Sequence, residues 1–253
     1  MSKKNPDNVP VTSPKRAMIL AAGKGRRMRP ITNKTPKPMV RINGRPLLAH
    51  ALARLEDAGV TDVVINTHHL GDQIRRHFKD YAGAALQFSG EEDLLETGGG
   101  VKKALPLLGD EPFYVVNGDA FWLNGPTDAL QRLAGEWDGA KMDALLMLHS
   151  TVEAYGYDGV GDFQCEADGV LIRRTEAEVV PWLFTGVQIL NPASLAGAPE
   201  GSFSLNWVYD QALEAGRLFG MVHDGEWFHI GTADGLGEAE RYMQTTFPES
   251  KHR

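Results

Sequence analysis

The sequence has little of what marks several classes of protein. Among its 253 residues there is one cysteine, Cys165, so no disulfide can form within the chain, and a reducing compartment is favoured. No run of about 18 or more apolar residues is present, which excludes a helix that spans a membrane. The formal net charge is −7, so a broad basic surface for nucleic acid is not expected. We therefore expect a cytoplasmic protein with no membrane and no nucleic-acid partner.

What is present in the first half is an alternation of short apolar runs and amphipathic stretches. The pattern predicts strands at 17–22, 63–66, 86–89 and 113–118, and helices at 46–59, 71–81 and 99–108. Short, nearly all-apolar strands separated by helices are typical of a parallel sheet that is covered on both faces. We expect an α/β fold with a mainly parallel, Rossmann-like sheet, whose ligands bind beyond the carboxyl ends of the strands.

The second half has a more mixed pattern. It predicts strands at 144–149, 157–161, 169–174, 184–190, 218–223 and 226–230, with helices at 204–215 and 233–243. We expect these strands to form a smaller, β-rich insertion beside the parallel sheet.

The most informative stretch follows the first predicted strand. Gly23 and Gly25 lack a Cβ, so the backbone there can turn tightly and approach a ligand closely. The same loop carries the basic residues Arg26, Arg27, Arg29, Lys34 and Lys37. Backbone N–H groups and cationic side chains together favour a polyphosphate. We expect the nucleotide phosphates to lie against Leu20, Ala21, Ala22, Gly23, Gly25, Arg26, Arg27 and Lys37.

Two other phosphate loops fit this stretch badly. Met28 occupies the place of the third glycine of a dinucleotide fingerprint, and Gly25 follows Lys24 where a Walker loop requires Ser or Thr. The stretch instead resembles the signature of the sugar-1-phosphate nucleotidylyltransferases, Gly-x-Gly-x-Arg-Met-x-Pro-x-Thr followed by Pro-Lys-Pro. The matching residues are Gly23, Gly25, Arg27, Met28, Pro30, Thr32, Pro36, Lys37 and Pro38.

The resemblance implies an in-line reaction without a covalent enzyme intermediate. The sugar 1-phosphate attacks the α-phosphorus of a nucleoside triphosphate, and pyrophosphate leaves. By this resemblance Arg27 holds the departing phosphates, Lys37 bridges the α-phosphate and the sugar phosphate, and Asp119 holds Mg²⁺. These three are the expected catalytic residues, and catalysis depends on positioning and charge neutralisation.

The expected metal site departs from the family pattern at one position. Asp119 ends an apolar strand in Asn117-Gly118-Asp119, where a carboxylate can serve as a hard ligand for Mg²⁺ or merely cap a turn. Relatives commonly carry Trp-x-Asp-x-Gly-Thr near the end of the domain, whereas this chain has His229 in place of that aspartate. His229 is expected to bind a metal, to contact a phosphate or only to fill space. The number of metal ions stays open.

The base-binding residues are expected around a second glycine cluster, Glu96-Thr97-Gly98-Gly99-Gly100. This spelling resembles the N-acetylmuramate-1-phosphate uridylyltransferases of bacterial wall recycling, whereas mannose-1-phosphate guanylyltransferases usually carry Gly-Thr-Ala-Gly. A carboxylate can accept from N3–H of uracil or from N1–H and N2–H of guanine, so UTP is favoured and GTP remains the alternative. The expected base and ribose contacts are Glu91, Glu92, Thr97, Gly98 and Asn117.

The sugar site is expected in the second half of the chain. Positions that line the sugar pocket of relatives correspond to Tyr155, Gly156, Thr185 and Gly186, with Arg174 and Glu178 between them. Arg174 either holds the sugar phosphate or lies on a solvated strand face. The expected partners are UTP and a sugar 1-phosphate, and the chain is expected to be a monomer or a homodimer. A ligand-sensing relative without catalysis is the alternative outside the enzyme class.

The predicted domain organisation follows from these assignments. We expect a disordered N-terminus at 1–14, one nucleotidyltransferase domain at 15–246 and a short tail at 247–253. Within the domain, the nucleotide half covers about 15–125 and the sugar half about 140–232.

Overall fold

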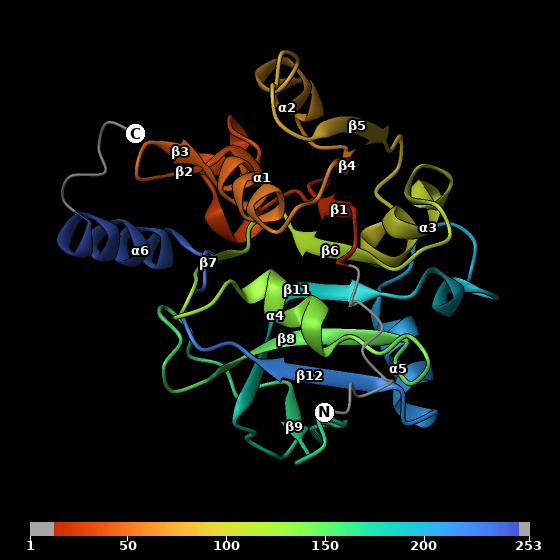
Figure 1. Cartoon of the computed structure of the whole chain (residues 1–253). Coiled ribbons are helices and arrows are strands. Elements are labelled where there is room, and N and C mark those ends of the chain that lie inside the picture. Colours follow the sequence, from red (N-terminus) through yellow and green to blue (C-terminus); the bar gives the residue numbers. More distant parts are fainter. Residues whose placement is uncertain (1–12, 248–253) are drawn as a thin grey trace, which may run out of the picture.

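The computed structural model describes residues 13–247, which form a nine-stranded sheet with helices on both faces (Figure 1). Residues 1–12 of the segment expected to be disordered, and residues 248–253 of the expected tail, lie outside the described residues. The division into a nucleotide half and a sugar half stays a prediction. Within the described residues, no helix is long and apolar enough to cross a membrane.

The first half of the chain builds the parallel part of the sheet. Its strands are β1 (Arg16–Leu20), β4 (Asp62–Thr67), β5 (Ala85–Gly90) and β6 (Phe113–Asn117). β1 pairs in parallel with β4 on one side and with β6 on the other, and β4 pairs in parallel with β5. The predicted parallel order is confirmed, so the carboxyl ends of these four strands meet at one edge.

The strands of the second half continue the same sheet instead of forming a sheet of their own. β11 (Trp182–Leu190) runs antiparallel to β6 and also pairs with β8 (Ala144–Ser150), which pairs in parallel with β12 (Leu218–Val222). The short strand β9 (Phe163–Cys165) pairs with the start of β11 at Trp182, and β10 (Leu171–Arg173) pairs with β9. One sheet therefore joins the two predicted halves.

The prediction of a strand at 157–161 is wrong. These residues are irregular, with a bend at Gly159; Gly161 has a left-handed φ of 79°, and its N–H donates to the Tyr157 hydroxyl at 3.1 Å. A local hydrogen bond of this kind competes with pairing in a ladder.

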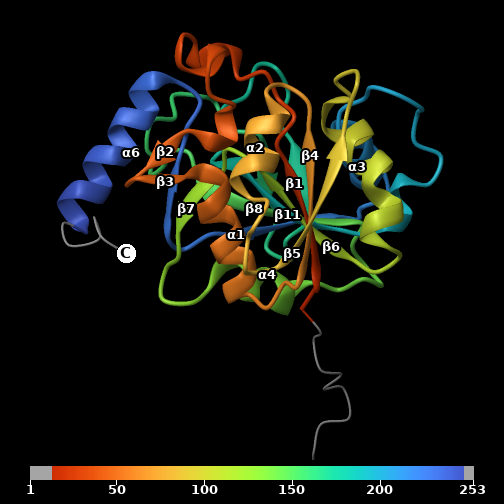
Figure 2. The ribbon, with the colours of Figure 1, turned by 90° about the horizontal axis from the view of Figure 1, so that it is seen from above.

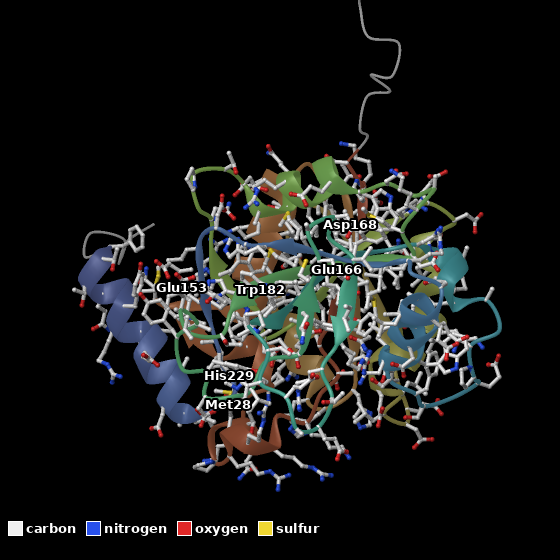
Figure 3. The ribbon with its side chains drawn as sticks, turned by 90° about the horizontal axis from the view of Figure 1, so that it is seen from below. Met28, Glu153, Glu166, Asp168, Trp182 and His229 are labelled. Atoms are coloured by element: carbon white, nitrogen blue, oxygen red, sulfur yellow. The ribbon has the colours of Figure 1, made fainter. Side chains whose placement is uncertain are left out.

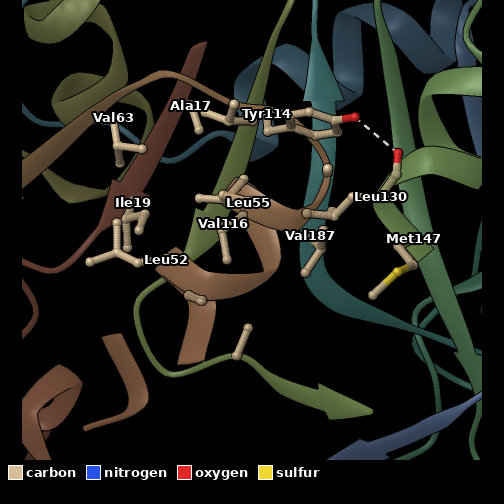
Figure 4. Close-up of a cluster of buried hydrophobic side chains, with 14 of the residues drawn as sticks. Ala17, Ile19, Leu52, Leu55, Val63, Tyr114, Val116, Leu130, Met147 and Val187 are labelled. Carbon is tan, nitrogen blue, oxygen red and sulfur yellow. Dashed lines mark hydrogen bonds between the residues drawn. The ribbon is translucent and has the colours of Figure 1, made fainter. Parts of the chain in front are cut away.

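The helices divide between the two faces of the sheet (Figure 2). One face buries α1 (Leu47–Asp57), α2 (Gly71–His77) and α4 (Ala129–Glu136), and the other buries α3 (Glu96–Leu108) and α5 (Asn206–Glu214). Figure 4 shows part of the first core, where Ile19 and Val116 pack against Leu52 and Leu55 of α1. In that core the Tyr114 hydroxyl donates to the carbonyl oxygen of Leu130 at 2.9 Å, which satisfies a buried polar group.

A third apolar cluster lies beside the ligand edge of the sheet. It packs α6 (Ala233–Thr246) against the hairpin of β2 (Arg41–Ile42) and β3 (Arg45–Pro46) and against the pair of β7 (Phe121–Leu123) and β13 (Glu226–Phe228). Met28 of the nucleotide loop is buried in this cluster. The cluster therefore anchors the loop after β1 through Met28.

The glycine cluster at 98–100 is not in a loop, which corrects the expected start of the third helix at Gly99. α3 begins at Glu96, so all three glycines lie within the helix. Its free N-terminal N–H groups find a partner far away in the sequence, since Gly98 N–H and Gly99 N–H donate to the Phe203 carbonyl at 2.9 and 3.1 Å. A single distant carbonyl thus caps the helix, which no local pattern indicates.

Candidate active site

A cavity of about 520 Å³ opens at the carboxyl ends of β1, β4 and β6. The residues that line it come from the end of β1 and the loop after it, from the ends of β4 and β6, from the start of α3, from the segment before α5 and from the loop before α6. They are Leu20, Ala21, Ala22, Gly23, Gly25, Arg26, Arg27, Lys37, Pro38, Asn66, Leu94, Glu96, Thr97, Asn117, Asp119, Ser204 and Gly231. The structure thus brings together the expected phosphate loop, both expected catalytic cations and Asp119.

The phosphate loop is shaped by its own motif residues. Gly25 has a left-handed φ of 57°, and a Cβ there would lie 2.9 Å from Thr32 Cγ2. The Thr32 hydroxyl donates to the Gly25 carbonyl at 2.8 Å, and Met28 N–H donates to the same carbonyl at 3.0 Å. The loop is therefore held in one shape, with Arg26 and Arg27 in a 3₁₀ turn at the cavity.

Lys37 and Asp119 meet at the cavity as an ion pair between Lys37 Nζ and the Asp119 carboxylate. The Lys37 side chain is 12% exposed, so its charge lies in a partly desolvated place. Behind the pair, Gly118 N–H donates to the Leu20 carbonyl at 2.9 Å, and a Cβ at Gly118 would lie 2.7 Å from that oxygen. Only glycine permits this close approach of the ends of β1 and β6.

His229 follows β13 and lies within electrostatic range of the same groups. Burial lowers the pKa of His229, and the charges of Arg27 and Lys37 lower it further, whereas Asp119 acts in the opposite direction. The imidazole is therefore neutral at pH 7, which is the form that can ligate a metal. Figure 3 shows His229 at the edge of the molecule that carries Met28, away from Glu166 and Asp168.

The residues expected around the base lie in three different places. Thr97 and Asn117 line the cavity, and Gly98 is buried in α3 against Phe203. Glu92 is exposed and is not among the residues that line the cavity. Glu91 is 6% exposed and does not line the cavity either, since its two carboxylate oxygens accept from Asn66 and from the Leu95 N–H.

Sequence reasoning missed Asn66, which lines the cavity and is 2% exposed. The signal was its place as a polar residue in an otherwise apolar strand, at the edge where ligands bind. Its role depends on partners 45 and 25 residues away, Ala21 and Glu91, which no local pattern reveals.

The expected sugar residues do not line this cavity. Gly186 comes nearest, because its left-handed φ of 83° brings it against Asn117, and a Cβ there would lie 2.6 Å from Asn117 Nδ2. The Thr185 hydroxyl donates to the Met147 carbonyl at 2.7 Å, and Tyr155 stacks on Phe228 with ring centroids 4.8 Å apart.

The remaining sugar candidates have local partners. Arg174 donates to the Thr175 carbonyl at 3.0 Å, and Glu178 accepts from Thr175 N–H at 2.8 Å. Gly156 has a left-handed φ of 69° beside Gly235. Arg174 lines a separate hollow that also contains Asp162, Arg173 and Glu176. This hollow has charges of both signs.

Residues 16–170 match the family described as Nucleotidyl transferase. The chain belongs to this family. The family resemblance predicted from the glycine loop and Pro36-Lys37-Pro38 is therefore confirmed. The family assignment agrees with a cavity whose phosphate loop, Lys37 and Asp119 all face the same space.

Two relatives of this nucleotidyl transferase have the same name. This chain is 39% identical over 224 residues to N-acetylmuramate alpha-1-phosphate uridylyltransferase from Caulobacter vibrioides. The aligned residues cover 87% of this chain and 93% of the relative. This chain is also 39% identical over 230 residues to the protein of that name from Neisseria meningitidis serogroup B, with 89% and 96% coverage.

Solved structures show the same fold at lower identity. UDP-glucose pyrophosphorylase complexed with UDP-glucose superposes with a TM-score of 0.74 at 19% identity, over 92% of this chain and 99% of that one. HddC from Yersinia pseudotuberculosis complexed with GMP-PN superposes with a TM-score of 0.73 at 24% identity, over 90% and 99%. The predicted sheet covered by helices is thus the fold of known nucleotidyltransferases.

Proposed function

We propose that this nucleotidyl transferase moves a uridylyl group from UTP to N-acetylmuramate 1-phosphate, giving a nucleotide sugar and pyrophosphate. The observation that carries the reaction class is the meeting of Arg26, Arg27, Lys37 and Asp119 around one cavity at the ligand edge of the sheet. The substrates are supported by the name of the two relatives at 39% identity and by the spelling Glu-Thr-Gly-Gly-Gly at 96–100. The role would be in peptidoglycan recycling, in the cytoplasm, where nucleoside triphosphates are available.

The chemistry needs no covalent intermediate, and the residues act by position and charge. Arg27 is placed to hold the phosphates that leave as pyrophosphate, and the neighbouring Arg26 adds positive charge. Lys37 is placed to bind the α-phosphate and the sugar phosphate together, which lowers their mutual repulsion and fixes the in-line geometry. The backbone N–H groups of the loop at 22–25 complete the phosphate contacts.

The donor set also fits a magnesium ion that is shared with the substrate. Among the residues the structure describes, no group of three or more His, Cys, Asp or Glu side chains could hold a metal by itself. Mg²⁺ is commonly held by one or two protein groups, with phosphate oxygens and water as its other ligands. Asp119 would be the hard oxygen ligand, and His229, whose pKa is influenced by the Asp119 charge, would supply the second protein ligand. When bound, Mg²⁺ would neutralise charge on the α-phosphate.

The test is a pyrophosphate-release screen of UTP, GTP, CTP, ATP and dTTP against a panel of sugar 1-phosphates. We expect UTP with N-acetylmuramate 1-phosphate to react fastest, and Asp119→Asn to serve as the inactive control. Predominant formation of a GDP-sugar would favour the guanylyltransferase alternative, to which mannose-1-phosphate guanylyltransferase of Drosophila pseudoobscura pseudoobscura, 29% identical, belongs. Nucleotide binding without pyrophosphate release for any pair would favour a sensing protein.

A further inference from the structure

A buried chain of three hydrogen bonds joins the phosphate loop to the start of α3. Ala21 N–H donates to Asn66 Oδ1 at 2.7 Å, and Asn66 Nδ2 donates to Glu91 Oε1 at 2.7 Å. The second carboxylate oxygen, Glu91 Oε2, accepts from Leu95 N–H at 2.9 Å. Asn66 is 2% and Glu91 6% exposed, so the two bonds of Asn66 are buried and the bond from Leu95 is partly buried.

The direction of these bonds dictates the two side chains. The two outer donors of this series of hydrogen bonds are the backbone N–H groups of Ala21 and Leu95. The side chains between them must therefore accept a hydrogen bond at each end. Asn66 accepts with one atom and donates with another, and an ionised Glu91 accepts with both oxygens. With the amide at position 66 and the carboxylate at position 91, all three donors are satisfied only if Asn66 turns its oxygen toward Ala21 and its NH₂ group toward Glu91.

The last glycine of the cluster at 98–100 is explained by this pair. A Cβ at Gly100 would lie 2.7 Å from Asn66 Nδ2 and 2.9 Å from Glu91 Oε1. The helix therefore passes directly over the hydrogen-bonded pair, and any side chain at this position would push the pair apart.

The start of α3 is held from the other side as well. Phe203 N–H donates to the Leu95 carbonyl at 3.1 Å, and Leu205 N–H donates to the Thr97 hydroxyl at 2.9 Å. Between these points Glu96 has a left-handed φ of 58°, a conformation that persists where the surroundings hold it. Glu96 and Thr97 line the same cavity as Ala21, so both fixed segments contribute to its wall.

We propose that Asn66 and Glu91 are positioning residues for the nucleotide, and that Glu91 acts through Asn66 and Leu95 instead of touching the base. Together they set the separation between Ala21, where the phosphate loop begins, and the start of α3, which we take to face the base. This inference rests on the proposed function only in taking a nucleoside triphosphate as the ligand of the cavity.

The test exchanges the amide and the carboxylate between positions 66 and 91, first one residue at a time and then together. Glu91→Gln removes one acceptor, and Asn66→Asp removes the donor and places two carboxylates in contact, without a large change in volume. In the double variant N66D/E91Q the new amide at 91 donates to the new carboxylate at 66, and both backbone N–H groups keep an acceptor. The double variant therefore restores all three hydrogen bonds.

We expect each single variant to raise the KM of the nucleotide about tenfold or more, because a buried donor or acceptor loses its partner. The KM of the sugar 1-phosphate and kcat should change much less. The double variant should return the nucleotide KM to within about threefold of the wild-type value. Tyr114→Phe removes a buried hydrogen bond of similar length at the opposite end of β6, and it should lower Tm without moving the nucleotide KM.

A lower Tm with an unchanged nucleotide KM in both single variants would overturn the positioning role, as would a double variant no better than its worse parent. The wild-type substrate screen decides the proposed function separately. If the wild-type protein prefers GTP, the same variants are compared by calorimetric titration with GTP, and the expected pattern of loss and rescue is unchanged.

Discussion

Lys37 and Asp119, which are 82 residues apart, form an ion pair at the mouth of the cavity. Lys37 comes from the Pro36-Lys37-Pro38 segment and Asp119 from the turn after β6, so the pair joins the two parts of the chain that carry the expected catalytic charge. In a phosphate-loaded site both groups have better partners, since the ammonium can bind phosphate oxygens and the carboxylate can bind a metal. The ion pair therefore fixes the two side chains beside each other at the cavity.

Lys37→Ala should lower kcat by about 100-fold or more, because a charge-stabilising group at the transition state typically contributes a few kcal/mol. The fold should survive, since the Lys37 side chain faces the cavity and not the core. Steady-state kinetics with a Tm measurement check both parts. Lys34→Ala, an exposed lysine of the same segment that does not line the cavity, is the matched control. Wild-type turnover in the folded Lys37 variant would remove Lys37 from the mechanism.

Local features explain why the phosphate loop could be predicted from the sequence. The left-handed Gly25 and its hydrogen bond to Thr32, seven residues away, lie within one short segment, so the motif carries its own geometry. Three of the parallel strands, β1, β4 and β6, were also predictable, because their apolar runs are buried on both faces. The cavity wall at the start of α3 was not predictable, since the cap on α3 comes from Phe203, more than 100 residues along the chain. Glu91 likewise gains its partners only in the folded protein.

His229→Ala should raise the Mg²⁺ concentration needed for half-maximal rate, if His229 is the second protein ligand. Burial and the charges of Arg27 and Lys37 lower the pKa of His229 from its ordinary value of 6.5, so the neutral ligand form predominates above that pH and is lost as the pH falls through the lowered value. The Mg²⁺ requirement of the wild type should therefore stay constant from about pH 8 to about 6.5 and rise below that range.

His229→Asp should remain active and lose this rise, because a carboxylate stays ionised over the same range. Mg²⁺ titrations at several pH values compare the two variants, with His77→Ala on the exposed surface of α2 as the control. An unchanged Mg²⁺ requirement in His229→Ala would leave Asp119 as the single protein ligand that we propose.

The buried His223 should make the fold sensitive to acid. Burial lowers the pKa of His223 to about 4, and the neighbouring His149 adds to the effect, while Asp224 opposes it. His223 takes up a proton near pH 6.5 in the unfolded chain but only near pH 4 in the folded chain. The free energy of unfolding is therefore highest above about pH 6.5 and falls as the pH decreases. The loss should reach about 3 kcal/mol at pH 4.

Urea titrations at pH 7.5 and pH 4.5 check this expectation. His223→Gln should reduce the difference in unfolding free energy between the two pH values, even if it costs some stability at pH 7.5. His77→Gln is the surface control. An equal acid sensitivity in His223→Gln and in the wild type would assign the effect to other groups.

The docking of residues 201–205 on α3 gives the last prediction, which compares two helical glycines. A Cβ at Gly99 would collide with the Gly201 carbonyl oxygen, whereas a Cβ at Gly237 of α6 has its nearest neighbour, Arg241 Nη1, at 3.7 Å. Gly99→Ala should therefore destabilise the protein by about 1–3 kcal/mol through the clash. Gly237→Ala should stabilise it by up to about 1 kcal/mol, because alanine favours the helix.

The same pair of variants separates stability from function. Gly99→Ala should also raise the KM of the nucleotide, because it would displace the start of α3, where Thr97 lines the cavity. Gly237→Ala should leave that KM unchanged. Thermal unfolding and steady-state kinetics measure the two effects on the same samples. A Gly99→Ala variant with wild-type Tm and wild-type nucleotide KM would mean that the segment at 201–205 yields freely, and that the start of α3 does not depend on its cap.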